Sequence, residues 1–236
     1  MVANAPAQSA ARIISIGLPA FRGPEEGVGQ FDAGDGELVD EAGADAGGLH
    51  RAVDFAVLIN AVELHAELSE QGVGFSSTSD SEIIAALLAT HPGPTMEDAI
   101  TDVLPRLQGA VSTVVMTKDR VYAFRDPAGV RPLVIGRLGE RYCISSESCA
   151  LDIIGAEYVR DVQPGEMVAI GEDGLTSRMV VEGEREAFCV FEHIYFARPD
   201  SKMGGTVLQA ARGRMGEILA RESPAPSADL VIAVPD

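Results

Sequence analysis

Two short segments near the middle of the chain constrain its fold more than any other part. The first, RDPAGVRPL (residues 125–133), contains the elements of a tight corner. Asp126 accepts hydrogen bonds from backbone amides two residues on, Pro127 presets its own torsion, and Gly129 takes the left-handed conformation. The second, SSESCALD (residues 145–152), predicts a strand end followed by a brief helix. A fold for this chain must accommodate both.

Short β-branched segments surround this corner at the spacing of hairpins. Turns that contain Gly139, Gly165 and Gly174 separate most of them. The brief helix CALDII begins at a Ser148 cap and ends at Gly155. Connections this short require antiparallel neighbours. The predicted strands lie within STVVMT, VYAF, LVIGRL, YCISS, YVRDV, MVAIG and LTSRMVV.

Helical segments precede these strands. Asn60 is a good N-cap for a first helix, which Gly72 can end. In the second helix Ser79 and Glu82 form a capping box before an apolar run. The third is MEDAITDVLPRLQG, which begins after a Thr95 cap and is expected to end or kink at its proline. Helices followed by hairpin strands predict an α+β fold in which helices cover antiparallel sheet, because the alternation of a doubly wound α/β fold is missing.

Composition narrows the class of protein. The chain has 236 residues, 46% of them hydrophobic, which is enough for one large domain or two small ones. Its formal net charge of -18 disfavours nucleic acid and anionic membrane surfaces as partners. The three cysteines, the lack of a secretion signal and the lack of a membrane-length apolar run predict a soluble protein in a reducing cytoplasm. The four histidines share no metal-ligand spacing, so we expect no metal site.

The two ends of the chain differ in character. Residues 1–12 predict a mobile tail, residues 13–21 fit a short strand or helix, and residues 22–48 predict an acidic loop with one short strand near residues 37–39. After a charged linker, CVFEHIYFA (residues 189–197) is apolar enough to be buried. Thr206 is expected to cap a last helix that ends near Glu222. LVIAV, which follows, predicts a strand of the kind found inside parallel sheets.

The segments around the corner resemble the amidophosphoribosyltransferase family. The matching stretches are RDPAGVRPL, residues 145–155, VQPGEM, CVFEHIYFARPDS, ARGRMGEILARE and ADLVIAVPD, with NAVELHAELSEQG and TSDSEII nearer the N-terminus. The family makes phosphoribosylamine from glutamine and phosphoribosyl pyrophosphate in purine synthesis. The resemblance implies an N-terminal-nucleophile hydrolase fold, in which layered antiparallel sheets are flanked by helices. It also implies three parts: a divergent segment 1–48, a glutaminase-like domain 49–222, and the start of a phosphoribosyltransferase-like domain 223–236.

The resemblance fails at the residues that perform the family's glutamine chemistry. The family uses an N-terminal Cys whose own amine is the base, whereas this chain begins Met1-Val2-Ala3 and has no cysteine before Cys143. The family's His-Val-Arg-Tyr motif, which binds the substrate carboxylate, has no counterpart. Where the family's His-Asn-Gly-Asn motif forms the oxyanion hole, this chain reads DFAVLINA (residues 54–61). We therefore predict no catalytic residue and no cofactor.

A few residues remain as site candidates. Asp80 matches the family residue that binds the glutamine amino group, although an Asp in the first turn of a helix is also favoured by the helix dipole alone. Phe191 and Tyr195 match aromatic residues along the family's ammonia passage, and the alternative for both is core packing. Cys149 fits an ordinary half-buried thiol. Cys189 aligns with an iron-sulfur ligand of some members, but the other ligands would lie in the absent domain.

Three hypotheses follow from this resemblance. The first is a homologue of the glutaminase domain without glutaminase activity, acting by binding a small molecule or as a partner subunit. The second is a repurposed enzyme of the same fold that performs another amide or acyl-transfer reaction. The third is a truncated gene product without a function of its own. The unpaired apolar segments predict a homo-oligomer or a complex with a separate subunit, because an exposed strand edge recruits another chain.

Overall fold

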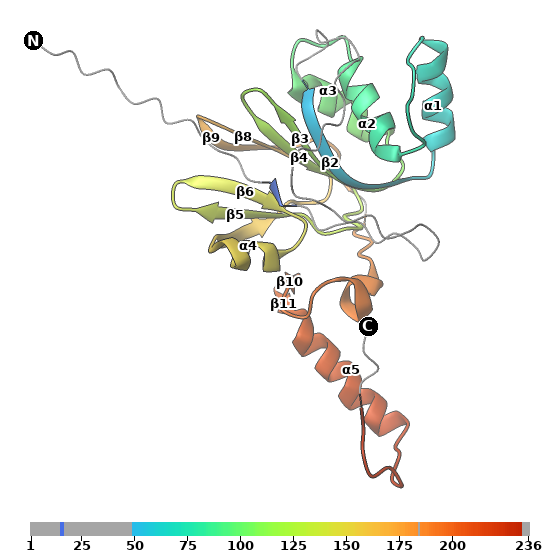
Figure 1. Cartoon of the computed structure of the whole chain (residues 1–236), viewed down its shortest axis with the longest axis vertical. Coiled ribbons are helices and arrows are strands. Elements are labelled where there is room, and N and C mark those ends of the chain that lie inside the picture. The colour runs from blue at the N-terminus through green and yellow to red at the C-terminus, as the bar shows by residue number, and fades with distance from the viewer. Residues whose placement is uncertain (1–14, 17–48, 184, 233–236) are drawn as a thin grey trace, which may run out of the picture. The chain divides into compact units, whose positions relative to one another are not determined.

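The computed structural model describes residues 15–16, 49–183 and 185–232. The chain divides into two compact units, Met1–Phe188 and Cys189–Asp236 (Figure 1). Within residues 13–21, the pair Ser15–Ile16 forms a two-residue strand, β1. The tail predicted for residues 1–12, the loop predicted for residues 22–48 and the short strand near residues 37–39 lie outside the described residues.

Three helices of the first unit confirm the helical prediction. Thr95 caps the third of them by accepting a hydrogen bond from the Asp98 amide at 3.1 Å, and a 3-10 turn containing Pro105 ends it. Turns of 3-10 helix are common at the ends of α-helices. The elements are α1 (Ala61–Glu70), α2 (Asp80–Ala89), α3 (Met96–Val103) and the 3-10 turn Leu104–Arg106.

The capping box predicted at the start of α2 is wrong in one half. The Ser79 hydroxyl accepts a hydrogen bond from the Ser81 amide at 3.3 Å, as a cap should. Glu82, however, binds upstream residues instead of the Ser79 amide that a capping box requires. Asn60 likewise precedes α1 but makes no side-chain cap hydrogen bond. In both cases the local pattern located the helix start but not the partner of the side chain.

Five antiparallel strands form the first sheet, in the order β2-β3-β4-β8-β9. Four of them correspond to predicted strand segments. The fifth, β2, was not predicted, and it pairs with β3 along its length with one irregularity between Leu49 and Arg51. The strands are β2 (Leu49–Leu58), β3 (Gly109–Thr117), β4 (Val121–Arg125), β8 (Glu166–Gly171) and β9 (Gly174–Met179).

The second sheet has the order β1-β6-β5-β7 and is antiparallel except where β1 pairs with β6. Its other strands are β5 (Val134–Leu138), β6 (Arg141–Ser145) and β7 (Glu157–Asp161). Helix α4 (Ser148–Ile154) connects β6 to β7 and ends at Gly155 as predicted, where the φ of 70° is left-handed. The predicted Ser148 cap is wrong, because Ser148 is the first helical residue and Glu147 occupies the cap position.

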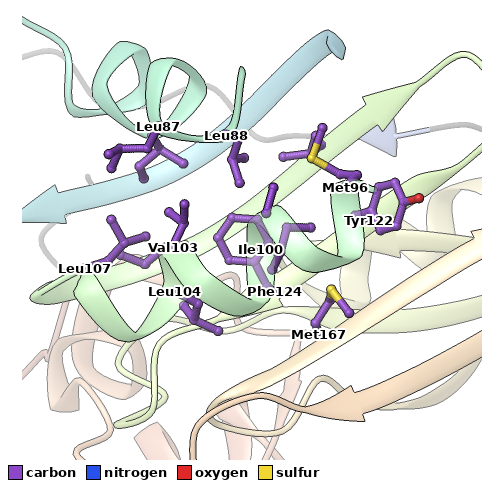
Figure 2. Close-up of a cluster of buried hydrophobic side chains, with 14 of the residues drawn as sticks. Leu87, Leu88, Met96, Ile100, Val103, Leu104, Leu107, Tyr122, Phe124 and Met167 are labelled. Atoms are coloured by element: carbon purple, nitrogen blue, oxygen red, sulfur yellow. The ribbon is translucent and has the colours of Figure 1, made fainter. Parts of the chain in front are cut away.

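Hydrophobic side chains hold these elements in four layers within the first unit. Residues of α1, α2 and α3 pack on one face of the five-stranded sheet, where Tyr122 and Phe124 meet Ile100 (Figure 2). The alternate residue Ala123 points to the opposite face, where it packs against Ile135 of the second sheet. Helix α4 covers the far side of that sheet. The order helix, sheet, sheet, helix confirms the prediction of layered antiparallel sheets flanked by helices.

The predicted corner connects the two sheets and is held by two buried charged side chains. Asp126, which is 1% exposed, accepts hydrogen bonds from the amides of Ala128 at 3.0 Å and Val111 at 3.1 Å. The Arg125 guanidinium donates to the backbone carbonyls of residues 129, 131 and 162 at 2.7, 2.7 and 2.9 Å. Because each buried charge is compensated by backbone groups, the corner is a structural element and not a binding site.

The second unit contains a short π-helix, two two-residue strands and a longer helix. They are the π-helix Glu192–Phe196, β10 (Lys202–Met203), β11 (Thr206–Val207) and α5 (Leu208–Glu222). Ala197, Met203 and Leu208 form its small core. The helix end at Glu222 agrees with the prediction. The Thr206 cap does not, since Thr206 lies in β11 and Val207 occupies the cap position without a side-chain bond.

Two apolar segments of this unit contradict the sequence prediction. The segment CVFEHIYFA was expected to be buried, but five of its large side chains are at least half exposed. They are Val190, Phe191, Ile194, Tyr195 and Phe196. LVIAV was expected to form a strand, whereas Leu230–Ile232 have no regular structure and are 78% to 88% exposed. A strand requires a neighbour to pair with, and the described residues provide none here.

Candidate functional site

Asp80 lies at the first position of α2, next to the end of β2. Its Oδ2 atom accepts a hydrogen bond of 2.8 Å from the backbone amide of Leu58. This contact joins two elements that are 22 residues apart in the chain. Ser79 caps the helix just before Asp80, so the carboxylate projects from the positive end of the helix dipole. The position is therefore fixed by a strand end and a helix start together.

The Asp80 carboxylate keeps part of its hydrogen-bonding capacity. In the described part of the chain, Leu58 is its hydrogen-bond donor and no donor reaches Oδ1. Asp80 as a residue is half-buried. A carboxylate with one oxygen held by the backbone and the other open is suited to accept a hydrogen bond from an ammonium group. Sequence reasoning identified Asp80, but not the Leu58 amide that orients it.

Glu82 organises the segment that leads to Asp80. Its two oxygens accept four hydrogen bonds, from the amides of Ser76 and Ser77 at 2.7 and 2.8 Å and from their hydroxyls at 2.9 and 2.6 Å. The Ser77 hydroxyl also accepts a hydrogen bond from the Ser79 amide at 3.2 Å. Partial burial raises the pKa of Glu82, but these hydrogen bonds outweigh it and lower the pKa to about 2.

Asn60 carries a side-chain amide two residues after Leu58, and this amide is engaged elsewhere. Its Nδ2 donates to the carbonyl of Arg106 at 2.9 Å, and its Oδ1 accepts from the Gln108 amide at 3.1 Å. Both ends of the amide thus join the start of α1 to the start of β3. The chain contains one other asparagine, Asn4. Asn60 is therefore a structural bridge and not a free donor.

Residues 54–58 of the segment DFAVLINA belong to β2 and form a regular ladder with β3, and residues 59–60 form the turn that leads to α1. Asp54 pairs with Thr113, Phe55 with Ser112 and Ala56 with Val111, without a bulge in this part. An oxyanion hole requires donors aimed at a single point, which sharp turns and side-chain amides provide. A regular strand with these residue types offers neither.

Tyr195 lies on the π-helix of the second unit, and Phe191 occupies the cap position just before it. The ring of Phe196 lies near both, with centroids 6.1 Å from Phe191 and 5.8 Å from Tyr195. Arg212 supports this short helix by donating to the carbonyls of His193 at 2.8 Å and Ala197 at 2.7 Å. Phe191 is 57% exposed and Tyr195 51%, so the alternative of core packing within the unit is wrong for both.

The cysteines give no indication of a reactive centre. Cys149 was expected to be half-buried but is 1% exposed, and its thiol donates to the carboxylate of Glu147 at 3.8 Å. Burial raises the pKa of the Cys143 thiol. Among the described residues no group of three histidine, cysteine or carboxylate side chains is placed to hold a metal ion. Nor does any described helix have the length and hydrophobicity to span a bilayer.

A cavity of about 250 Å³ lies among α1, α2 and α3, and sequence reasoning did not find it. Its polar wall includes two pairs of side chains in contact. Arg106 contacts Glu67 at 2.6 Å, and His91 Nε2 contacts Asp102 at 3.0 Å. His91 Nδ1 accepts a hydrogen bond from the Gly93 amide at 3.0 Å. These four side chains therefore bind one another across the wall of the cavity.

Comparisons with known proteins place this arrangement in a family. A family model described as a glutamine amidotransferase domain matches residues 52–152. The amidophosphoribosyltransferase of Synechococcus elongatus is 48% identical over 185 residues, covering 76% of this chain and 37% of that relative. The amidophosphoribosyltransferase of Bacillus subtilis is 41% identical over 179 residues, with the same coverage of 76% and 37%. This chain thus spans 37% of the length of these two curated relatives.

Solved structures agree. The glutamine phosphoribosylpyrophosphate amidotransferase of B. subtilis, complexed with ADP and GMP, matches with a TM-score of 0.72 and 38% identity, over 74% of this chain and 38% of that one. The structure of an allosteric regulatory enzyme of purine biosynthesis matches with a TM-score of 0.72 and 36% identity, over 76% and 40%. This chain therefore carries a glutamine amidotransferase domain of the kind found in amidophosphoribosyltransferases, with the N-terminal-nucleophile hydrolase fold.

Proposed function

We propose that this domain binds L-glutamine, or a closely related amino acid, through Asp80 and does not hydrolyse it. On this proposal the protein acts as a binding domain or partner subunit within chemistry of the amidophosphoribosyltransferase type. Asp80 would receive the ligand's ammonium group at its open carboxylate oxygen, while the Leu58 amide holds the other oxygen. The geometry supports this because a charge-assisted hydrogen bond requires an oriented, accessible carboxylate.

The proposed absence of hydrolysis rests on Asn60, because both ends of its side-chain amide are already hydrogen-bonded. Amide hydrolysis passes through a tetrahedral oxyanion, and losing one of the donors that stabilise it typically costs about a hundredfold to a thousandfold in rate. The Asn60 amide is used at both ends by Arg106 and Gln108. The adjacent strand β2 contributes a regular ladder from Asp54 to Leu58 and no amide side chain. No preorganised donor set is then available from this part of the site.

Binding and hydrolysis can be tested separately on the purified full chain. Calorimetric titration with L-glutamine should give saturable binding that Asp80→Asn abolishes. Asp173→Asn is the control and should leave binding unchanged, because Asp173 is exposed in the turn between β8 and β9, at the edge of the sheet opposite β2. Release of glutamate should stay at the level of a blank without protein. Glutamate release that Asp80→Asn abolishes would show that the domain is an active glutaminase. A flat titration would exclude the binding role.

We infer further that the second unit contacts a partner, either another copy or a separate subunit. The support is the set of half-exposed aromatic side chains on the π-helix and at its cap position, Phe191, Tyr195 and Phe196. A group of exposed apolar side chains of this kind is typical of interaction sites. In a complete assembly Phe191 and Tyr195 would line the ammonia passage to which their family counterparts belong. The cytoplasm is the proposed location, since all three cysteines are free.

The division into residues 1–48, 49–222 and 223–236 stays a proposal. The side chains of Leu230, Val231 and Ile232 are 78% to 88% exposed. This exposure supports assigning residues 223–236 to a part of the protein other than the glutaminase-like domain.

A further inference from the structure

Hydrogen bonds through the Ser77 hydroxyl link the Glu82 carboxylate to the amide of Ser79, the residue just before Asp80. The Glu82 carboxylate accepts from the Ser77 hydroxyl at 2.6 Å, and that hydroxyl accepts from the Ser79 amide at 3.2 Å. Ser79 in turn immediately precedes Asp80 and caps α2. Fixing the backbone of residues 76–79 therefore fixes the direction in which the Asp80 side chain leaves the helix.

The segment of residues 76–79 has little other support. It contains neither helix nor strand, and all four of its side chains are exposed. The Glu82 carboxylate alone accounts for four hydrogen bonds to its first two residues, Ser76 and Ser77. With a pKa of about 2, Glu82 stays ionised throughout the neutral range, which keeps these bonds charge-assisted.

We infer that Glu82 is the positioning residue of the Asp80 subsite: by clamping Ser76 and Ser77 it holds the Asp80 carboxylate against the Leu58 amide, in the orientation that an amino-acid ammonium group would meet. This inference rests on the proposed function for its ligand. Its structural half, the coupling of Glu82 to the contact between Asp80 and Leu58, stands on the hydrogen bonds alone.

Amide hydrogen exchange on the full chain tests the structural half. Glu82→Gln preserves shape but cannot accept four hydrogen bonds, so exchange at the Leu58 amide should accelerate roughly tenfold, toward the rate in Asp80→Ala. The amide of Phe124, in the core strand β4, should keep its protection. Glu140→Gln makes the same charge change on an exposed turn of the other sheet and should alter neither amide.

The outcomes separate a positioning role from a structural one. If Glu82→Gln accelerates Leu58 and Phe124 by the same factor, Glu82 stabilises the whole domain and positions nothing in particular. An unchanged Leu58 rate overturns the coupling directly. Should Glu82→Gln fail to fold, Ser77→Ala removes the single link to the Ser79 amide and is expected to give the same selective acceleration at Leu58, about half as large on a logarithmic scale.

Titration with L-glutamine tests the ligand half. Where the unmodified chain binds, Glu82→Gln should raise the dissociation constant about tenfold, while Glu140→Gln leaves it unchanged. Equal affinity in Glu82→Gln and the unmodified chain would overturn the positioning role for binding. If the unmodified chain does not bind L-glutamine, the proposed function fails and the ligand half fails with it. The exchange result still decides whether Glu82 orients Asp80.

Discussion

A Cβ atom on Gly129 would lie 2.7 Å from Cγ of Pro164, so two turns that are 35 residues apart pack directly against each other at a glycine. The amide of Gly165, next to Pro164, donates to the carbonyls of Arg125 at 3.2 Å and Asp126 at 3.0 Å. These contacts join the corner after β4 to the turn before β8. Because β4 pairs with β8, the contact between the two turns stabilises the same strand register that brings the turns together.

Replacing Gly129 should therefore cost more than the backbone strain of its positive φ. Gly129 and Gly139 have nearly identical φ values of 62° and 61°, but an added Cβ at Gly139 would meet nothing within 4 Å. Gly139→Ala should lower the free energy of unfolding by about 1 kcal/mol, and Gly129→Ala by about 2 to 3 kcal/mol. Urea denaturation of the two variants measures the difference. Equal losses would mean that Pro164 moves aside without cost.

The corner also shows what local sequence can predict. Asp126, Pro127 and Gly129 lie within four residues, so their turn chemistry requires no knowledge of the rest of the fold. The predictions for Asp126 and Gly129 are confirmed. Strand β2 was missed because its pairing is remote: Val53 meets Val114, about sixty residues later in the chain. The same limit applies to the candidate site, where Asp80 was identified and its partner Leu58 was not.

The errors in the second unit have a different physical origin. Hydrophobicity states which side chains gain free energy from burial, but burial requires a complementary surface. Phe191 and Tyr195 have none in the described part of their unit, and they remain half exposed. The segment Leu230–Ile232 is apolar enough for a buried strand, yet no described strand pairs with it. Hydrophobicity therefore predicted a tendency toward burial. These side chains stay exposed because the described residues provide no surface or strand to cover them.

Arg160 and Glu166 form an ion pair between the two sheets that should make stability depend on pH. The guanidinium donates to both carboxylate oxygens at 2.7 Å, and Glu166 is nearly buried. Burial raises the pKa of Glu166, but the hydrogen bonds from Arg160 and from the Gln163 amide outweigh it, so its pKa lies below the ordinary 4.5. A lowered pKa in the folded state gives stability that is present above pH 4.5 and is lost as the pH falls through the folded-state value.

Glu166→Gln should lower the free energy of unfolding by about 2 kcal/mol at neutral pH, and this loss should shrink as the pH falls below 4.5. Glu157→Gln is the matched control, because Glu157 pairs with Arg137 at 3.3 Å on an exposed surface. It should cost less than about 0.5 kcal/mol at every pH. Thermal unfolding measured from pH 7 to pH 3 makes the comparison. Parallel curves for the unmodified chain and Glu166→Gln would contradict the assignment.

Asn60 should contribute more to stability than an ordinary residue before a helix. Its amide donates to the Arg106 carbonyl and accepts from the Gln108 amide, so removing the side chain breaks two hydrogen bonds between separate elements. Asn60→Ala should cost about 2 kcal/mol. Asn60→Asp keeps the acceptor and loses the donor, so it should cost roughly half as much. Equal losses in chemical denaturation would show that only the donor to Arg106 matters.

Association through the second unit is the prediction that bears most directly on how this protein works. The apolar surface consists of the side chains Val190, Phe191, Ile194, Tyr195 and Phe196. Arg212 holds the π-helix that presents them, so the surface is ordered and not a loose segment. The net charge of -18 opposes indiscriminate aggregation at low salt and favours a defined contact over precipitation.

Light scattering of the purified chain at micromolar concentration should therefore give a mass above the 24.8 kDa of a monomer if the chain associates with itself. If its partner is a separate subunit, the isolated chain should bind a hydrophobic dye. Phe191→Ser combined with Tyr195→Ser should reduce both signals, because it removes two exposed aromatic rings without touching the core at Leu208. Met179→Ser, an exposed apolar residue at the end of β9, controls for a general loss of surface hydrophobicity. A monomer that binds no dye would show that this surface is covered by the chain itself and that no partner is required.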